Sequence, residues 1–220
     1  MKIIKHDVKL ITSSPYPEQL IEQAGRVCYK SEEKITNDSA VKFVRGVTRR
    51  GHHSVIEHAS ATFRIITDRG ITHEIVRHRL ASYSQESTRY VNYGGTDMQF
   101  IVPCALAHMP PVNEIKARWL QACLNAEYVY NWLINDGTKP QVARSILPNC
   151  LKTEIVMTAN FREWRHFVAL RSSAGAHPDI RIIACWVWKI LNTIAPSVFD
   201  DLYNDDMQEA HKLYDEYYSV

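Results

Sequence analysis

Residues Ala59–Thr67 read ASATFRIIT, and this stretch decides the fold class. Apolar side chains occupy every second position, namely Ala59, Ala61, Phe63 and Ile65. Successive side chains of a β-strand point to opposite faces, so a period of two predicts a strand with one buried face. A similar alternation over residues 151–159 predicts a second strand, far from the first along the chain.

Around these strands, apolar residues recur with the 3.6-residue period of a helix. Helices are predicted over residues 18–28, 39–50, 71–79, 113–135, 161–171, 178–194 and 205–217, and a further one from Pro140. Residues 68–70 are predicted as a turn and residues 80–100 as a loop. Because helices outweigh the separated strands, the expected class is α+β, a small central sheet flanked by helices. Without repeats or linkers, residues 1–220 are expected to form a single domain.

Composition narrows the class of protein further. The chain is 45% hydrophobic and 23% charged, which is typical of globular proteins. It contains no apolar run of membrane-spanning length and no apolar segment after its basic start, so neither a membrane partner nor a signal peptide is expected. The five cysteines are widely spaced and include no Cys-x-x-Cys pair. That spacing predicts inert thiols in a cytoplasmic protein rather than a disulfide framework.

Positive charge is concentrated in one part of the chain. The formal net charge is only +2, yet residues 45–90 hold eight Arg, no Lys, four acidic residues and five of the ten His. Arginine offers planar, bidentate contacts to phosphate and carboxylate groups. This distribution leaves three interpretations open: a site for an anionic ligand, a nucleic-acid surface, or a solvated face with salt bridges.

Two histidine-rich segments contain candidate metal ligands. His73 and His78 are five residues apart, so on a helix they lie roughly 140° apart and cannot share one zinc ion easily. In the segment 51–58, His53 and Glu57 are four apart, but no third ligand stands at a suitable spacing. No metal site is therefore predicted, and a polar pocket wall is the favoured interpretation of segment 51–58.

The segment Arg77–Tyr90 reads RHRLASYSQESTRY. Nearly every side chain in it can form hydrogen bonds. Guanidinium groups fit phosphate, whereas hydroxyl groups and Gln85 fit the edge of a base. These residues predict a phosphorylated, nitrogen-rich ligand without identifying it.

The pattern Arg-His-Arg-x-x-Ser-x-x-x-x-Ser-x-Arg-Tyr in Arg77–Tyr90 resembles the signature of the flavin-dependent thymidylate synthases. The segment Gly51–His58 is similar to an upstream element of that family. Downstream, the resemblance continues in order and spacing through Arg144, Leu147-Pro148, Asn160 and Leu170-Arg171. It covers residues 50–185, which is most of the chain.

This resemblance implies an activity. The family methylates dUMP to dTMP with methylenetetrahydrofolate as one-carbon donor and FAD, reduced by NADPH, as hydride source. It implies no enzymatic Cys nucleophile, and a homotetramer in which each active site is shared between subunits. Its partners are small molecules, and no nucleic acid is among them.

The resemblance also implies site residues. The expected dUMP contacts are Glu74, Arg77, Gln85, Ser87, Arg89, Arg144 and Arg171. The expected FAD contacts are His52, Ser54, Glu57, Arg77, His78, Arg79 and Asn160. The expected catalytic residues are Arg171 and Ser87, with Arg171 polarising a uracil carbonyl. The chain has no Gly-x-Gly-x-x-Gly loop, so cationic side chains are expected to bind the pyrophosphate instead.

Three positions depart from the family pattern. Glu74 stands where Gln is frequent and is expected to repel the nucleotide or to pair with Arg77. His166 replaces a common Asn, and Gly175 replaces a frequent His. Two other functions stay open at this point: a nucleic-acid-binding module that uses the Arg-rich stretch 45–90, and a nucleotide- or flavin-binding protein without catalysis.

Overall fold

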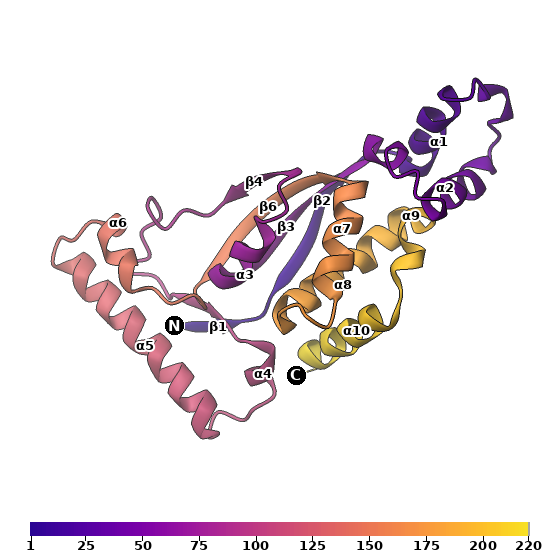
Figure 1. Cartoon of the computed structure of the whole chain (residues 1–220). Coiled ribbons are helices and arrows are strands. Elements are labelled where there is room, and N and C mark those ends of the chain that lie inside the picture. The colour runs from indigo at the N-terminus through magenta and orange to yellow at the C-terminus, as the bar shows by residue number, and fades with distance from the viewer. Residues whose placement is uncertain (220) are drawn as a thin grey trace.

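A four-stranded antiparallel sheet forms the centre of the computed structural model, which describes residues 1–219 (Figure 1). Its strand order is β2 (Asp7–Ser13), β3 (Ser60–Asp68), β6 (Lys152–Asn160) and β4 (Ala81–Gln85). The central pair, β3 and β6, is in register from Ser60 opposite Asn160 to Asp68 opposite Lys152. A separate parallel pair consists of β1 (Lys2–Ile4) and β5 (Gln99–Ile101). Both strands predicted from alternation are confirmed.

Helices follow the predicted ranges closely. They are α1 (Pro17–Val27), α2 (Ser39–Arg49), α3 (Arg69–Ile75), α4 (Cys104–Ala107), α5 (Glu114–Asn135), α6 (Pro140–Ala143), α7 (Phe161–Ser172), α8 (Pro178–Ile194), α9 (Pro196–Phe199) and α10 (Asp205–Tyr218). Short 3₁₀ helices are η1 (Glu32–Lys34), η2 (Val55–His58), η3 (Arg144–Ile146) and η4 (Asp200–Leu202). The α+β class is confirmed. Within residues 1–219, no helix has the length and apolar character needed to cross a bilayer.

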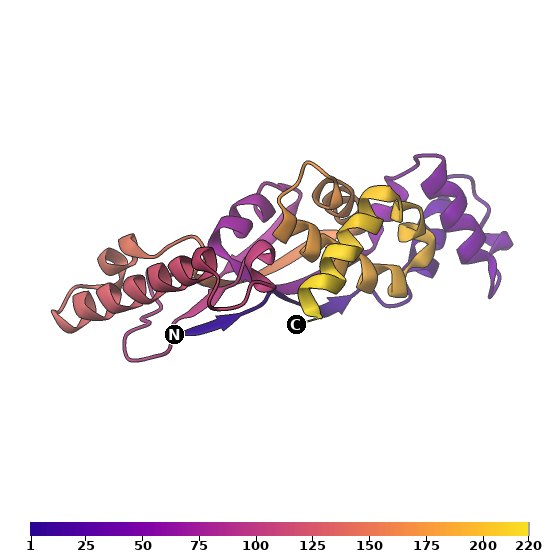
Figure 2. The same ribbon diagram turned by 90° about the horizontal axis from the view of Figure 1, so that it is seen from below.

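The sheet has one buried face. Ala61, Phe63 and Ile65 on β3 are at most 1% exposed and belong to the main core together with α7 and α8. Trp164 of α7 packs edge-on against Phe63, and its indole N–H donates to the carbonyl of Ala61 at 3.0 Å. Helices α1 and α2 lie at one end of the molecule, and α5 and α6 lie at the other (Figures 1 and 2). The main core thus joins the sheet to α7, the helix that carries part of the site.

The structure corrects three local predictions. Residues 68–70 are not a turn, because Asp68 ends β3 and its carboxylate accepts from the backbone N–H of Ile71 as the N-cap of α3. Helix α3 then ends at Ile75, so the residues 77–79 lie in a connecting segment and not in a helix. The predicted loop 80–100 contains strands β4 and β5. Strands β1 and β2 were not predicted.

The cysteines differ in exposure. Cys28 is exposed, while Cys123 and Cys185 are buried. The sulfur atoms of Cys123 and Cys150 lie 3.7 Å apart as free thiols, joining α5 to the segment before β6. Burial raises the pKa of the Cys185 thiol to about 12. A thiol with so high a pKa is not nucleophilic at pH 7.

His6, between β1 and β2, is a buried titratable group. Its Nδ1 lies 3.0 Å from the hydroxyl of Thr67, while its Nε2 lies 3.9 Å from the Asp179 carboxylate and has no hydrogen-bond partner among the described residues. Burial lowers the pKa of His6 from 6.5 to about 4, although Asp179 opposes the shift. The folded protein therefore holds this imidazole in its neutral form.

We predict that His6 makes the protein sensitive to acid. The stabilising contribution of a lowered folded-state pKa is complete above pH 6.5 and is lost as the pH falls toward 4. Between about pH 7.5 and about pH 4.5, His6 should account for a loss of roughly 2 to 3 kcal/mol in the free energy of unfolding. Urea titrations of the wild type and of His6→Asn at the two pH values measure this loss. The free energy of unfolding of the variant should fall by roughly 2 to 3 kcal/mol less than that of the wild type. Equal pH dependence in the two proteins would contradict the prediction.

Candidate functional site

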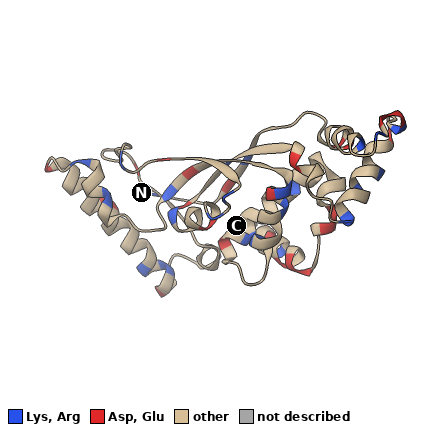
Figure 3. Ribbon diagram, turned by 45° about the horizontal axis from the view of Figure 1, so that its top comes forward, with Lys and Arg blue, Asp and Glu red and all other residues tan. Residues whose placement is uncertain are grey.

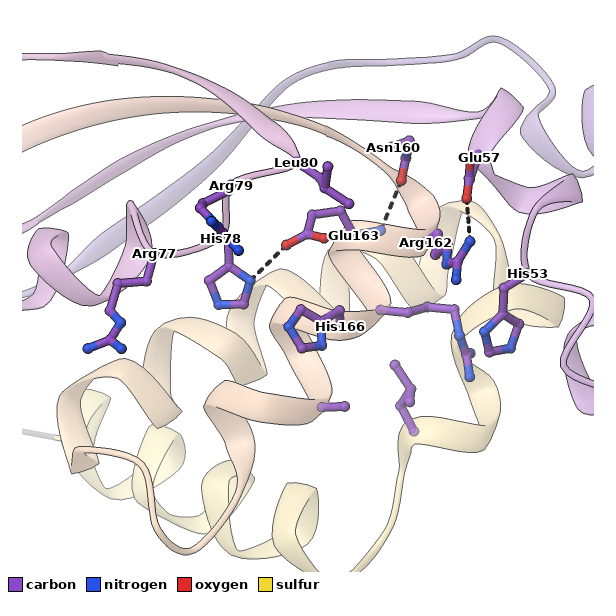
Figure 4. Close-up of a pocket in the computed structure, with 13 residues that line it drawn as sticks. His53, Glu57, Arg77, His78, Arg79, Leu80, Asn160, Arg162, Glu163 and His166 are labelled. Carbon is purple, nitrogen blue, oxygen red and sulfur yellow. Dashed lines mark hydrogen bonds and ion pairs between the residues drawn. The ribbon is translucent and has the colours of Figure 1, made fainter.

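A cavity of about 910 Å³ lies between η2, the segment that follows α3, and the first turns of α7 (Figure 4). Its volume is in the range of ligand-binding pockets. Its lining is dominated by cationic and polar side chains, namely His53, Glu57, Arg77, His78, Arg79, Leu80, Asn160, Arg162, Glu163, Arg165, His166, Ala169 and Leu202. The cavity therefore favours an anionic ligand.

The connecting segment after α3 supplies the first wall of this cavity. Tyr83 of β4 holds it in place, because its hydroxyl donates to the carbonyls of Ile75 at 3.0 Å and His78 at 2.6 Å. Burial raises the pKa of Tyr83 to about 12, so the hydroxyl keeps its proton at pH 7. Arg77 and Arg79 are exposed on either side of the buried His78, and neither forms an ion pair with any residue in 1–219. Both guanidinium groups are thus available to an anion.

Helix α7 supplies the opposite wall. Asn160 ends β6 and caps α7, since its side-chain oxygen accepts from the backbone N–H of Glu163 at 2.9 Å. Arg162 pairs with Glu57 of η2 at 2.6 Å, and Arg165 pairs with Asp201. These ion pairs partly neutralise two of the four arginines of the cavity. The remaining positive charge comes from Arg77 and Arg79.

His78 stands at the centre of a chain of hydrogen bonds. Its Nδ1 lies 2.9 Å from a carboxylate oxygen of Glu163, and its Nε2 accepts from Nε of Arg171 at 3.1 Å. The guanidinium of Arg171 also donates to Glu74, through Nη1 to the carboxylate at 2.9 Å and through Nη2 to the backbone carbonyl at 2.7 Å. Glu74 therefore pairs with Arg171, not with Arg77 as expected. Burial, reinforced by the positive charge of Arg171, lowers the pKa of His78 even though Glu163 opposes this shift.

His78, Glu163 and His166 bring metal-ligand atoms within 4.8 Å of one another. Both ring nitrogens of His78 are already engaged, by Glu163 and by the cationic Arg171. A metal ion would have to displace one of these contacts and lie close to a guanidinium. Hydrogen bonding is the better description of this cluster.

Two of the predicted flavin contacts lie outside the cavity. His52 and Ser54 line a second hollow of about 710 Å³ between α1 and α2, together with Arg26, Tyr29 and Arg50. The other five predicted contacts, Glu57, Arg77, His78, Arg79 and Asn160, line the cavity itself. The segment 52–57 contributes to both spaces, since His53 and Glu57 line the cavity whereas His52, Ser54 and Val55 line the second hollow.

The predicted nucleotide contacts form two groups. Glu74 and Arg171 meet beside His78, as described. Arg144 of η3 instead donates to the Thr88 hydroxyl at 3.3 Å, and the backbone N–H of Arg89 donates to the Ser87 hydroxyl at 3.3 Å. Neither Ser87, Arg89 nor Arg144 lines the cavity. The structure thus does not bring the whole predicted set together within the described chain.

Gln85 lies on β4, close to the second group. Its amide nitrogen donates to the hydroxyls of Thr72 at 3.0 Å and Thr153 at 3.3 Å. The donor side of this amide is therefore used within the protein, whereas its oxygen accepts no hydrogen bond from residues 1–219.

Among the residues of the cavity wall that the sequence did not identify as contacts, five are polar or charged, namely His53, Arg162, Glu163, Arg165 and His166. Four of them lie on α7. A signal for one was present, because Asn160-x-x-Glu163 has the spacing of a capping box. In a capping box the Glu side chain turns back to the cap residue, whereas here it turns to His78 (Figure 4).

Fold and cavity together define an α+β protein with a cavity whose arginine side chains suit an anionic ligand. Residues 9–197 match the family model described as thymidylate synthase complementing protein. The flavin-dependent thymidylate synthase of Geobacter sulfurreducens is 36% identical over 88% of this chain and 85% of its own length. The enzyme of Mycolicibacterium gilvum is 38% identical over 89% of this chain and 83% of its own length. The enzyme of Corynebacterium glutamicum is 33% identical over 94% of this chain and 88% of its own length.

A solved structure with the same fold illustrates the likeness. It is described as a UMP/dUMP methylase, PolB from Streptomyces cacaoi, bound with 5-Br dUMP. The TM-score is 0.78 at 23% identity, and the match covers 91% of this chain and 96% of that one. The chain belongs to the flavin-dependent thymidylate synthase family, as its motif indicated, and is an enzyme of that type.

We predict that the Tyr83 hydroxyl stabilises the cavity wall. Tyr83→Phe removes the donor to two carbonyls and should lower the free energy of unfolding by about 1 to 3 kcal/mol. Denaturant titration measures this loss. Tyr128→Phe is the matched control, because Tyr128 is 71% exposed and its hydroxyl should contribute less than about 0.5 kcal/mol. Equal effects of the two substitutions would contradict the role of Tyr83.

Proposed function

We propose that this chain converts dUMP to dTMP, with methylenetetrahydrofolate as the one-carbon donor and FAD, reduced by NADPH, as the hydride source. Family membership supports this reaction. The observation that carries it is the cationic cavity beside Arg171, built by the motif segment 77–79 and α7. The solved structure from Streptomyces cacaoi, which shares the fold, is described as a UMP/dUMP methylase.

The residues present fit a dinucleotide cofactor such as FAD. The cavity and the second hollow flank the segment 52–57, so an extended ligand can contact both. Arg77 and Arg79 suit the pyrophosphate, because charge-assisted hydrogen bonds from guanidinium groups are strong and bidentate. We assign His52 and Ser54 to one part of the cofactor and Glu57, His78 and Asn160 to another. When bound, FAD supplies the hydride, and the protein supplies placement.

Arg171 is the proposed electrostatic catalyst. Three of its N–H groups already donate to His78 and Glu74, which orients the guanidinium. Arginine has five N–H groups, so two are left for a uracil carbonyl. A fixed cation at that oxygen stabilises the negative charge that develops on the ring. Glu74 then acts as the partner that holds Arg171 in place.

Nucleotide binding is assigned to the second group of residues. Arg89 and Arg144 are exposed cations for the phosphate, and we assign Ser87 as a catalytic residue beside them. Gln85 offers its amide oxygen to the base. Arg77, with no acidic partner among the described residues, serves both ligands.

No cysteine is assigned to the chemistry. Among residues 1–219, the wall of the cavity includes no cysteine, and burial raises the pKa values of Cys104 and Cys185 to about 12. This environment supports methylation without a covalent bond between a thiol and the base. The five free thiols also support a cytoplasmic location, where thiols stay reduced.

We propose a homotetramer that shares its active sites. The split of the nucleotide contacts into two groups supports it, because a second copy can bring its Ser87, Arg89 and Arg144 to the cavity of the first. The face of β3 and β6 opposite the main core is only half-buried and offers a surface for such contact. We treat residues 1–220 as one catalytic domain of that assembly.

The alternative of a nucleic-acid-binding module finds little support. The Lys and Arg positions are spread along the whole molecule and do not gather in one region of the ribbon (Figure 3). Within the stretch 45–90, Arg45 pairs with Asp200 at 2.9 Å and Arg64 pairs with Glu154. A polynucleotide surface needs many unpaired cations on one face.

We predict a tritium-release activity. Protein loaded with FAD should absorb near about 450 nm and release tritium from dUMP labelled at carbon 5. Release should depend on both NADPH and methylenetetrahydrofolate. A flavin-loaded protein that binds dUMP without releasing tritium would overturn the reaction and favour a binding protein without catalysis.

We predict that Arg171→Ala lowers kcat/KM for dUMP by about 10²- to 10³-fold, the loss typical of one electrostatic donor. Arg171→Lys, which keeps the charge but not the planar guanidinium, should recover only part of the loss. Steady-state kinetics measure both, with circular dichroism to confirm folding. Turnover at the wild-type level in the alanine variant would refute the role of Arg171.

A further inference from the structure

Glu163 is a buried carboxylate that the proposed reaction does not use. It is 6% exposed and lies on the first turn of α7, where the cap formed by Asn160 fixes its backbone. Its side chain turns to His78, which is 3% exposed, across 2.9 Å (Figure 4). Both side chains are thus largely buried although they lie in the cavity wall.

The donors and acceptors around His78 permit one arrangement of its proton. The guanidinium of Arg171 can only donate, so Nε2 of His78 must accept. A neutral imidazole whose Nε2 accepts carries its proton on Nδ1. That N–H needs an acceptor, and the Glu163 carboxylate is the group at hydrogen-bond distance.

We propose that Glu163 is a positioning residue for Arg171 and acts through the tautomer of His78. The carboxylate holds the proton on Nδ1, the free Nε2 lone pair holds Nε of Arg171, and Glu74 holds the far side of the guanidinium. With the proton on Nε2 instead, two N–H groups would face each other and Arg171 would turn away. This inference rests on the proposed function, in which Arg171 meets the base.

Other groups around His78 do not compete for its proton. His166 and Phe167 of α7 lie with ring centres 5.2 Å and 5.0 Å from the imidazole, and both rings are tilted against it. The Tyr83 hydroxyl donates to the backbone carbonyl of His78 and not to its ring. Glu163 is therefore the acceptor that the geometry assigns to Nδ1–H.

Three substitutions of Glu163 separate the acceptor from the charge and from packing. Glu163→Leu removes the acceptor and fills a similar volume. Glu163→Ala also removes the acceptor but leaves the volume empty, and it serves in case the leucine variant fails to fold. Glu163→Gln keeps an acceptor oxygen but removes the charge. The matched control is Glu18→Leu, because Glu18 is also buried and accepts a backbone N–H, from Ser197 at 2.8 Å, outside both hollows.

The first measurement reads the tautomer directly. Solid-state NMR of flavin-free protein with ¹⁵N-labelled histidine, assigned with a His78→Asn variant, should show His78 protonated on Nδ1 in the wild type, in Glu163→Gln and in Glu18→Leu. The proton should move to Nε2 in Glu163→Leu and Glu163→Ala. A His78 that stays protonated on Nδ1 in both of these variants would overturn the proposal.

The second measurement is the rate of dUMP methylation with FAD bound. In Glu163→Leu and Glu163→Ala, kcat should fall about 10- to 100-fold, a loss typical of removing an orienting partner. KM for NADPH should stay unchanged. Glu163→Gln should stay within about threefold of the wild type, since it restores the acceptor. Equal losses in the glutamine and leucine variants would overturn the proposal.

The outcomes distinguish a failure of the proposed function from a failure of the positioning role. An inactive wild type with His78 protonated on Nδ1 would refute the proposed function and leave the hydrogen-bonded chain intact. An active wild type whose Glu163 variants keep both the tautomer and the rate would refute the positioning role and leave the function intact.

Discussion

The pairing of β3 with β6 is the constraint on which the site depends. The strands are in register over their full length, and each runs directly into a helix whose cap is the last residue of the strand, Asp68 for α3 and Asn160 for α7. Because the two strands are antiparallel, these helices begin at opposite ends of the sheet. A slip of one residue would turn every side chain of a strand to the other face. It would also shift the first turn of α7, and with it Glu163, away from His78.

Strong periodic patterns allowed much of the fold to be predicted. Strands β3 and β6 lie at the centre of the sheet and bury every second side chain, so their alternation is clear. Strands β2 and β4 lie at its edges, where the polar stretch Ala81–Gln85 has no fully buried residue and β2 buries only Val8. In β4 the inward side chains Ala81 and Tyr83 are only half-buried, so the alternation along this edge strand is weak. Residues 68–70 have the composition of a turn, but the Asp68 side chain caps a helix there instead.

The site was predictable where it is local in sequence. The motif segment brings Arg77, His78 and Arg79 to one wall within three residues, and their residue types alone indicate an anionic ligand. The opposite wall comes from α7, more than 80 residues later, and meets the first through the pairing of β4 with β6, which places Ala81 opposite Ala159. No local pattern reports such a contact, so Glu163 resembled an ordinary residue in the first turn of a helix. The pairing of Glu74 with Arg171 has the same long-range origin.

The reliance of the cavity on side-chain cations has an evolutionary consequence. A glycine-rich loop binds phosphate with backbone N–H groups, and these persist when a neighbouring side chain changes. Here each cationic group is encoded by its own codon, so a single missense change removes a whole contact. Such a site has low mutational robustness, but it can also be retuned one contact at a time. The exposed positions Arg77 and Arg79 are where drift would alter ligand affinity with the least effect on the stability of the fold.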